Sequence, residues 1–311
     1  MARIITVTPN PVRDYAVDAD AVEANRKIRC KNPETHPGGG GINVARATSR
    51  LGEKTLAIFT VGGASGEALK AAMAQENVPM LAIAVDGETR IALHVHDIAD
   101  GNEYRFSLPG AEWSGDEAER LRATIEAEAA AGDFIVGSGS LPPGAPEDFW
   151  AQVARLSKKK AARFVLDSVS GREAAIKEGF FLLRQNKFEY PTLAGGELAW
   201  PDEIISFAEG LVSAEKVECV AITHGGDGSI MATRNGVARV NALPVTTNSA
   251  VGAGDSFVGG LLVGLLQGWD DETALRYGMC AAAATRLTPG TALFDPADVA
   301  RLFNAPLRQK I

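Results

Sequence analysis

Residues 249–257 read Ser-Ala-Val-Gly-Ala-Gly-Asp-Ser-Phe and lead into an apolar stretch that ends at Leu266. Glycine at positions 252 and 254 lets the backbone come close to a ligand, and the amide groups that open a helix have no partner within it. Such amides bind anions, so Asp255 would lie beside a bound anion. A carboxylate in this place suits phosphoryl transfer to a hydroxyl group, because it can accept the hydroxyl proton. A glycine turn in which Asp255 only stabilises the start of the helix explains the same residues.

A second glycine run lies near the N-terminus, at residues 37–47, and reads Pro-Gly-Gly-Gly-Gly-Ile-Asn-Val-Ala-Arg-Ala. Glycine has no Cβ atom, so positions 38–41 permit the close approach of a polyol and expose their N–H groups. Asn43 adds a side chain that both donates and accepts hydrogen bonds. These residues predict a site for a small hydroxyl-bearing ligand, and a flexible turn is the alternative.

The composition argues against several classes of protein. The 311 residues are 46% hydrophobic and carry a net charge of −8, which argues against nonspecific nucleic-acid binding through Lys and Arg. No stretch is long and apolar enough to span a bilayer, and the N-terminus lacks the apolar core of a signal peptide. The three widely spaced cysteines suggest neither a disulfide framework nor a zinc site. We therefore expect a cytoplasmic protein with no nucleic-acid or membrane partner.

Short apolar segments typical of buried strands recur along the chain and alternate with helix-like segments. The strand-like segments are residues 4–7, 55–60, 133–136, 163–166, 180–183 and 219–223. This alternation predicts an α/β fold in which a mostly parallel sheet is covered by helices on both faces.

Two regions break this alternation and read as half-buried antiparallel strands. Residues 90–96 and 104–107 alternate apolar and polar side chains, and residues 14–18 and 27–30 do the same near the N-terminus. We expect these segments to form a small sheet over the mouth of the site, here called the lid. The side chains that the lid would turn toward a ligand are Asp14, Lys27, Arg90 and Arg105.

The opposite face of the expected lid would be apolar and would have no core of its own to cover it. It would consist of Ile91, Leu93, Val95, Tyr104 and Phe106. A large exposed apolar patch is unusual, and the lid of another subunit would cover it. We therefore expect a homodimer joined through the lid.

Together, the two glycine runs resemble the two signatures of the PfkB carbohydrate kinases of the ribokinase superfamily, and the likeness extends over the whole chain. The resemblance implies a single ribokinase-like domain over residues 1–311. Its fold would be a three-layer α/β sandwich around a mostly parallel sheet, with a discontinuous β lid at approximately 12–33 and 88–108. The family arrangement also implies that the lid joins the subunits of a dimer.

The resemblance further implies ATP- and Mg²⁺-dependent phosphorylation of a ketohexose phosphate. Fructose 6-phosphate is the expected acceptor, and tagatose 6-phosphate and fructose 1-phosphate are the alternatives. A catalytically weak sensor of sugar phosphates or nucleotides on the same fold stays open. A dinucleotide-dependent oxidoreductase is disfavoured, because the glycine run at 38–41 lacks the G-x-G-x-x-G spacing within a βαβ unit.

The resemblance assigns roles to individual residues. The catalytic base would be Asp255, with an anion hole formed by Gly252, Ala253 and Gly254. The sugar phosphate would be bound by Asp14, Lys27, Arg29, Gly39, Gly40, Asn43, Arg90, Arg105 and Ser140. ATP would lie against Arg184, Asn186, Thr223, Gly225, Gly228, Gly252 and Gly254. Magnesium would be organised by Asn186, Glu189 and Asp167, whose oxygen atoms suit that ion.

The sequence departs from the family pattern in two places. Arg184 and Gln185 stand where the family usually has Lys-Pro, and Ala250 stands where it usually has Thr or a close substitute. Arginine keeps the positive charge but presents a planar fork instead of a point charge. The missing hydroxyl at Ala250 removes one hydrogen bond near the nucleotide or an adjacent monovalent-cation site. The turnover rate and any dependence on K⁺ are therefore left open.

Overall fold

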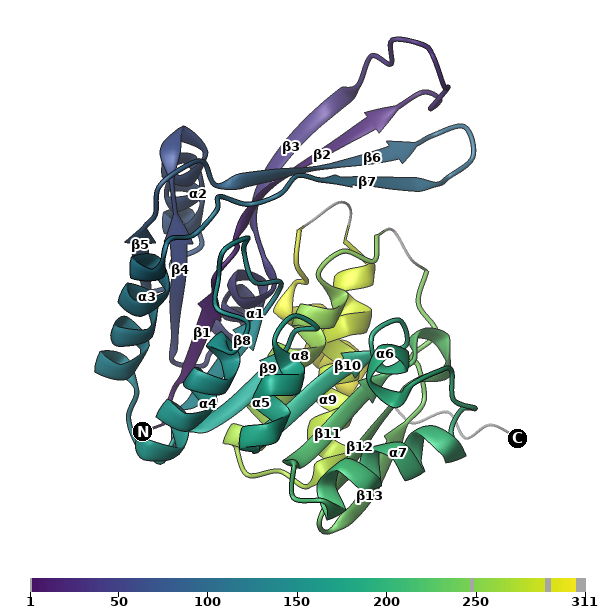
Figure 1. Cartoon of the computed structure of the whole chain (residues 1–311). Coiled ribbons are helices and arrows are strands. Elements are labelled where there is room, and N and C mark those ends of the chain that lie inside the picture. Colours follow the sequence, from purple (N-terminus) through teal and green to yellow (C-terminus); the bar gives the residue numbers. More distant parts are fainter. Residues whose placement is uncertain (1, 247–248, 289–291, 306–311) are drawn as a thin grey trace.

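The computed structural model describes residues 2–246, 249–288 and 292–305, and in this part of the chain the strands form two sheets (Figure 1). The larger sheet has nine strands in the order β13-β12-β11-β10-β9-β8-β1-β4-β5. Neighbours from β5 to β11 are parallel, and β12 and β13 continue the sheet in antiparallel fashion. The strands are β1 Ile4–Thr8, β4 Thr55–Val61, β5 Met80–Ala84, β8 Phe134–Ser138, β9 Arg163–Asp167, β10 Phe180–Asn186, β11 Val217–Thr223, β12 Ser229–Thr233 and β13 Gly236–Val240.

Helices cover both faces of this sheet and complete a three-layer α/β sandwich, as predicted. One face packs against α3 to α7, and the other packs against α1, α2, α8 and α9, with α10 against α9. The helices are α1 Gly40–Arg50, α2 Gly63–Gln75, α3 Gly115–Glu128, α4 Phe149–Lys159, α5 Arg172–Glu178, α6 Tyr190–Ala194, α7 Asp202–Ser213, α8 Ala253–Leu266, α9 Asp271–Arg286 and α10 Pro296–Asn304, with a 3₁₀ turn η1 at Gly225–Asp227. None of the described helices combines the length and the apolar character that crossing a bilayer needs.

The central strands are apolar on both faces because helices bury both faces. Every residue of β1 and β4 is buried, and their sequences show no alternation of polar and apolar side chains. Each of the six predicted strand segments overlaps one strand of this sheet. The carboxyl ends of the parallel strands form one edge of the sheet, and ligands bind at this edge in open α/β folds. The last residues of four strands lie there, namely Thr8, Ser138, Asp167 and Thr223.

Glycines let α8 pack closely against two neighbouring helices. A Cβ atom at Gly259 would lie 2.8 Å from Cβ of Ala47 in α1, and one at Gly260 would lie 2.9 Å from the carbonyl oxygen of Tyr277 in α9. Larger side chains would push α8 away from both helices, since protein interiors are densely packed. The two glycine runs at the starts of α1 and α8 are thereby brought together at the edge of the sheet.

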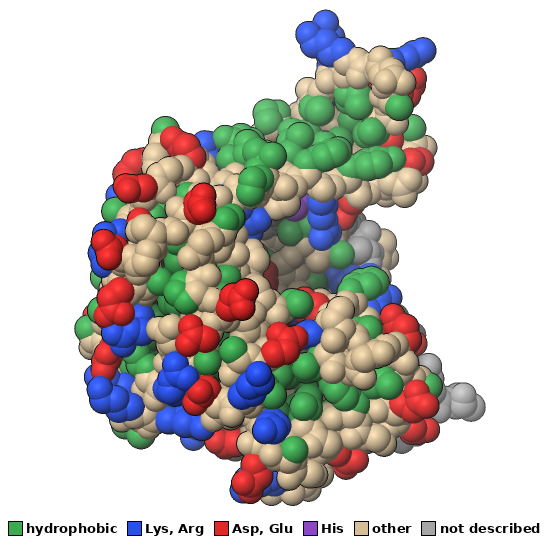
Figure 2. All heavy atoms as spheres, viewed as in Figure 1, with side chains coloured by type: hydrophobic (Ala, Val, Ile, Leu, Met, Phe, Trp, Pro, Cys, Tyr) green, Lys and Arg blue, Asp and Glu red, His purple; other side chains and the backbone are tan. Residues whose placement is uncertain are grey.

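The second sheet is the lid, with strand order β3-β2-β6-β7, and it projects over this edge (Figure 1). A space-filling view shows a hollow beneath it (Figure 2). β2 pairs with β3 and β6 with β7 in antiparallel fashion, whereas β2 and β6 are parallel. The strands are β2 Val12–Ala19, β3 Lys31–Gly38, β6 Arg90–Asp97 and β7 Glu103–Ser107.

The strand expected at residues 27–30 is wrong. These residues belong to the connection between β2 and β3, and β3 begins at Lys31 and extends to Gly38, beyond the expected lid boundary at 33. β3 contains Pro33 and Pro37, which cannot donate hydrogen bonds to a neighbouring strand and therefore argue against a strand in the sequence. They are tolerated because β3 is an edge strand.

Apolar side chains gather on the outer face of the lid (Figure 2). Ile91, Leu93 and Phe106 are exposed there, Phe106 by 54%. Tyr104 is half-buried, and Val95, which was expected on the uncovered face, is buried. The described chain thus leaves a smaller apolar surface uncovered than the alternation of residues 90–96 predicts.

Candidate active site

Asp255 lies in the first turn of α8, which begins after Gly252 in the left-handed conformation, with φ of 74°. A Cβ atom at Gly252 would also lie 2.8 Å from Leu293, so both the backbone and the space favour glycine. Because the N-cap residue is glycine, no N-cap side chain bonds to the amide groups at this helix start. The amide of Ala253 donates to the carbonyl oxygen of Ala250 at 3.4 Å, whereas no partner is recorded among the described contacts for the amides of Gly252 and Gly254, which suits the predicted anion hole.

Asn43 connects the two glycine runs. Its Nδ2 donates to Oδ2 of Asp255 at 2.9 Å, although the two residues are 212 positions apart. Asn43 lies in the first turn of α1, whose N-cap is Gly39 with φ of 107°. A Cβ atom at Gly40 would collide with Oγ of Ser138, so glycine here also serves the packing of α1 against the strand ends.

The environment of Asp255 raises its pKa from the ordinary 3.8 to about 7. Burial is the largest cause, and the negative charge of Asp167 adds to it. The hydrogen bond from Asn43 and the charge of Arg184 act in the opposite direction, and Asp14 raises the pKa slightly. A carboxylate with a pKa near 7 is suited to act as a general base at neutral pH.

Asp14 is buried on β2, and its Oδ1 lies 3.0 Å from Nε2 of His94 on β6. Gly38 packs against this carboxylate, because a Cβ atom there would collide with Oδ2 of Asp14. The sequence analysis did not single out His94 as a site residue. The signal was available in the alternation of residues 90–96, which places His94 and Arg90 on the same face of the strand.

Arg90 joins the lid to the loop after β1. Its Nε and Nη2 donate to the carbonyl oxygen of Asn10 at 3.3 and 3.2 Å, and its Nη1 donates to Ser107 at 2.8 Å. Nδ2 of Asn10 in turn donates to Oγ of Ser140 at 3.1 Å. Burial lowers the pKa of Arg90, and the nearby Asp14 opposes this. The predicted residues Arg90, Ser140 and Asp14 are thus near one another, and Asn10 is a connecting residue that the sequence analysis missed.

Of the other basic candidates, Lys27 and Arg29 lie apart from this group, whereas Arg105 lies directly opposite His94 in the pairing of β6 with β7. Lys27 and Arg29 are exposed in the β2–β3 connection, where Lys and Arg side chains gather at the tip of the lid (Figure 2). Arg90 lies opposite Val12 at the start of β2, whereas Lys27 and Arg29 follow the other end of that strand at Ala19. The length of β2 therefore separates them from Arg90. Arg105 is exposed and forms an ion pair with Glu103 at 3.2 Å.

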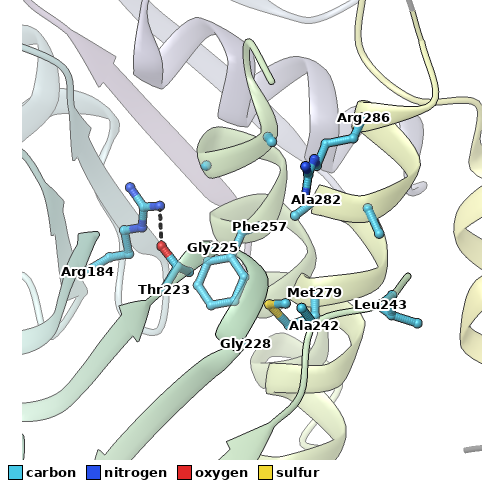
Figure 3. A pocket seen from close by; sticks show the side chains of 13 residues that line it. Arg184, Thr223, Gly225, Gly228, Ala242, Leu243, Phe257, Met279, Ala282 and Arg286 are labelled. Atoms are coloured by element: carbon cyan, nitrogen blue, oxygen red, sulfur yellow. Dashed lines mark hydrogen bonds between the residues drawn. The ribbon is translucent and has the colours of Figure 1, made fainter. Parts of the chain in front are cut away.

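A pocket opens beside α8 (Figure 3). Five predicted nucleotide residues line it, namely Arg184, Thr223, Gly225, Gly228 and Gly254. The rest of its wall is formed by Ala242, Leu243, Ala253, Phe257, Met279, Ala282, Ala283 and Arg286. Small and apolar side chains of this kind suit a flat ring such as adenine. Sequence reasoning missed most of them because they are indistinguishable from core residues of a helix or strand.

The turn at residues 224–228 lies beside this pocket. It connects the antiparallel strands β11 and β12 as a hairpin with a 3₁₀ turn, and its Gly225 and Gly228 line the pocket. Two further nucleotide candidates, Asn186 and Gly252, are not among the residues that line this pocket.

Arg184 is the buried cation of the site. Its Nη1 donates to Oδ1 of Asp167 at 3.0 Å, and its Nη2 donates to Oγ1 of Thr223 at 2.8 Å (Figure 3). A Cβ atom at Gly254 would lie 3.0 Å from Nη2, so the guanidinium lies directly beside the amides of α8. Arg184, which stands where the family usually has Lys, thus places its charge beside Asp167, Thr223 and Gly254 and uses both ends of its fork.

Gln185, the other departure, points into the interior. It accepts a hydrogen bond from the buried Arg172, and its Nε2 donates to the carbonyl oxygen of Arg184 at 2.7 Å. Arg172 also donates to the carbonyl oxygen of Glu189 at 2.9 Å. Gln185 therefore helps to hold the segment that carries Arg184 and Glu189.

Asn186 and Glu189 stabilise their own turn. Glu189 Oε2 accepts from the backbone nitrogen of Asn186 at 2.9 Å, and Asn186 Oδ1 accepts from that of Phe188 at 2.8 Å. Burial and the neighbouring Asp167 raise the pKa of Glu189, and Arg184 lowers it. Within the described residues, no three His, Cys, Asp or Glu side chains cluster as metal ligands. A magnesium ion here would take most of its ligands from phosphate oxygens and water, so the metal roles of Asn186, Glu189 and Asp167 stay predictions.

Comparisons with known proteins place these features in a family. Residues 8–298 match the pfkB family carbohydrate kinases. The chain is 38% identical over 301 residues to the ATP-dependent 6-phosphofructokinase isozyme 2 of Mycobacterium tuberculosis, an alignment that covers 97% of this chain and 89% of the relative.

Solved structures agree with this match. The crystal structure of phosphofructokinase-2 from Escherichia coli in complex with substrates and products superposes with a TM-score of 0.93 at 36% identity, over 97% of this chain and 98% of that one. The structure of Arabidopsis thaliana ribokinase complexed with ribose and ATP superposes with a TM-score of 0.76 at 20% identity, over 98% and 100% of the two chains, which shows a ribokinase-like fold. The chain belongs to the pfkB family and is a carbohydrate kinase.

Proposed function

We propose that the chain transfers the γ-phosphoryl group of ATP to a ketohexose phosphate, and that fructose 6-phosphate is the acceptor. The position of Asp255 carries this proposal. It is hydrogen-bonded to Asn43 on the side of the sugar-binding candidates, and it lies in the helix turn that borders the apolar pocket. A carboxylate between a polyol site and a nucleotide pocket suits direct phosphoryl transfer. The similarity to the mycobacterial 6-phosphofructokinase supports the choice of acceptor.

In this proposal Asp255 accepts the proton of the primary hydroxyl at C1 of fructose 6-phosphate. The hydroxyl oxygen forms a bond to the γ-phosphorus as the bond from that phosphorus to the β–γ bridging oxygen breaks, and ADP leaves. The amides of Gly252 and Gly254 and the guanidinium of Arg184 stabilise the negative charge on the transferred group. These donors are already in place, so little reorganisation is needed during the transfer.

The sugar phosphate and ATP both carry phosphate groups, and each set of phosphates needs its own binding residues. Arg90, held by Asn10 beside Ser140, is the cation that we assign to the phosphate of the sugar, because charge-assisted bonds to phosphate are strong. Asp14 and Asn43 would bind the sugar hydroxyls between Arg90 and Asp255. Magnesium would reduce the charge of the ATP phosphates, and Asn186 and Glu189 are the residues that would hold it through water.

The apolar outer face of the lid supports a homodimer. Ile91, Leu93 and Phe106 are exposed side by side on neighbouring strands, with Leu93 opposite Phe106 in the register. A second copy of the lid would remove this apolar surface from water.

An ADP-release assay with ATP and Mg²⁺ tests the proposed reaction. Fructose 6-phosphate, fructose 1-phosphate, tagatose 6-phosphate and unphosphorylated fructose should be compared, and fructose 6-phosphate should give the highest kcat/KM. A higher kcat/KM with either other phosphate would reassign the acceptor. Binding of sugar phosphate without ADP release from any of them would favour the sensor.

A further inference from the structure

Arg46 is the most deeply buried cation of α1, with only 1% of its surface exposed. Its Nη2 and Nε lie 2.6 and 2.8 Å from Oε1 of Glu76 at the end of α2. The other end of the fork, Nη1, donates to the carbonyl oxygen of Pro37 at 3.2 Å and to Oδ1 of Asn43 at 3.3 Å. Arg46 therefore forms an ion pair with Glu76 and also contacts the Asn43 amide, which in turn contacts Asp255.

The chemistry of Arg46 determines which way the Asn43 amide is turned. A guanidinium can only donate hydrogen bonds, so the atom of Asn43 that faces it must be the oxygen. The atom that faces Asp255 is then the amide nitrogen, in agreement with the 2.9 Å contact from Nδ2 to Oδ2. If the amide turned over, two acceptors would face each other at the ionised Asp255 and two donors at Arg46.

The amide keeps part of its hydrogen-bonding capacity for a ligand. Asn43 has two N–H donors and two oxygen lone pairs, of which Asp255 takes one donor and Arg46 takes one lone pair. One donor and one acceptor remain for sugar hydroxyls. Arg46 thus determines both what Asn43 offers to the substrate and what it offers to the base.

We propose that Arg46 is a positioning residue for phosphoryl transfer: it holds the Asn43 amide with the oxygen turned away from Asp255, so that the nitrogen always donates to the base. This inference rests on the proposed function, in which Asp255 is the base. Arg46 touches neither substrate in this account and acts only through Asn43.

A neighbouring arginine provides a matched control. Arg50 also forms an ion pair with Glu76, at 3.0 Å, and donates to the carbonyl oxygen of Phe294. It lies one helical turn after Arg46 and has no hydrogen bond to Asn43 among the described contacts. A purely structural role of the ion pairs with Glu76 would be shared by both arginines, whereas orientation of Asn43 belongs to Arg46.

The test compares Arg46→Lys with Arg50→Lys. Lysine keeps the charge beside Glu76, but its single nitrogen cannot stand where both Nη2 and Nη1 of Arg46 stand. Arg46→Lys should lower kcat about 10-fold through misplacement of Asn43 and Asp255, with the KM for ATP changed less than about twofold. Arg50→Lys should lower the unfolding temperature and leave kcat within about twofold of wild type.

A double-mutant cycle shows whether Arg46 acts through Asn43. In an Asn43→Ala background, Arg46→Lys should cause no further fall in kcat. A wild-type kcat in Arg46→Lys would overturn the inference, and so would the same 10-fold fall in the Asn43→Ala background.

Neutron diffraction from deuterated wild-type crystals gives an answer that does not depend on any variant. Deuterium atoms on the Asn43 atom that faces Asp255 would support the inference, and deuterium on the atom that faces Arg46 would overturn it. The diffraction result would remain valid even if the chain proved inactive. Inactivity would overturn the proposed function and not the orientation of Asn43.

Discussion

Arg184 and Asp167 form a buried ion pair at the carboxyl ends of the neighbouring strands β10 and β9, with Nη1 of the arginine 3.0 Å from Oδ1 of the aspartate. The two residues act on Asp255 in opposite directions, since Asp167 raises its pKa and Arg184 lowers it. The same guanidinium contacts Thr223 and lies beside Gly254. The pair therefore links the edge of the sheet to the start of α8 and to the candidate base.

Replacing Arg184 by Met should leave Asp167 buried without a counter-charge. The free energy of unfolding, measured with urea at pH 7.5, should fall by about 3–5 kcal/mol. In an Asp167→Asn background the same substitution should cost much less, because the unpaired charge is absent. Equal losses in the two backgrounds would show that the ion pair does not account for the effect.

Replacing Arg90 by Ala should weaken binding of the sugar phosphate. We expect its KM to rise by one to three orders of magnitude, about 1.5–4 kcal/mol of lost binding, with a small change in the KM for ATP. Arg155→Ala serves as the control, since Arg155 is an exposed arginine on α4, outside the lid, and is paired with Asp148 and Glu178. An unchanged sugar-phosphate KM in Arg90→Ala would remove Arg90 from the site.

Placing a charge on the outer face of the lid should break the proposed dimer. Leu93→Asp should yield monomers by light scattering, because a carboxylate would be buried in the apolar interface. Phe188→Asp is the matched control, since Phe188 is also apolar and exposed but lies outside the lid. A wild-type chain that is monomeric at assay concentrations would contradict the dimer.

The pKa of about 7 for Asp255 predicts the pH dependence of the rate. Only the ionised carboxylate can accept the hydroxyl proton, so kcat/KM for the sugar phosphate should fall below pH of about 7 and approach a tenfold loss per pH unit. The profile should be measured at constant ionic strength with a coupling system tested at each pH. An acid limb near the ordinary value of 3.8 would contradict the raised pKa of Asp255.

The same pKa predicts how stability changes with pH. Folding raises the pKa of Asp255, so the folded chain holds this proton more tightly than the unfolded chain. Stability from this group is fully present below pH 3.8 and is lost as the pH rises toward about 7. Asp255→Asn removes the titrating group. Its gain in unfolding free energy over wild type should therefore be larger at pH 8 than at pH 5 by at least about 1 kcal/mol.

The sequence predicted the parts of the fold that have a strong local pattern. The buried parallel strands have continuous apolar segments, and the glycine runs mark the starts of α1 and α8. β3 was not predicted, because its two prolines argue against a strand in the sequence although an edge strand tolerates them. The sequence analysis therefore placed Lys27 and Arg29 on a strand that does not exist.

Residues that act through tertiary contacts had no such signal. Asn10 is an example, because it meets Arg90 and Ser140 only where the lid folds back onto the loop after β1. Arg46 reads in the sequence as an ordinary helix residue, and its hydrogen bond to Asn43 depends on burial between α1 and Glu76. The wall of the pocket beside α8 includes Leu243 and Met279, apolar side chains of a kind that also fills cores.

The kcat of Asp255→Asn with fructose 6-phosphate and saturating ATP measures the role of this carboxylate in the transfer. Asparagine keeps the size and the polarity but cannot accept the proton, so kcat should fall by about 10²–10⁴-fold with small changes in both KM values. Asp270→Asn is the matched control, because Asp270 caps α9 through a bond from Thr273 and asparagine caps a helix as well as aspartate. It should be nearly silent. An Asp255→Asn enzyme that keeps more than about a tenth of the wild-type kcat would contradict the role of Asp255 as base and leave it as a helix-start residue.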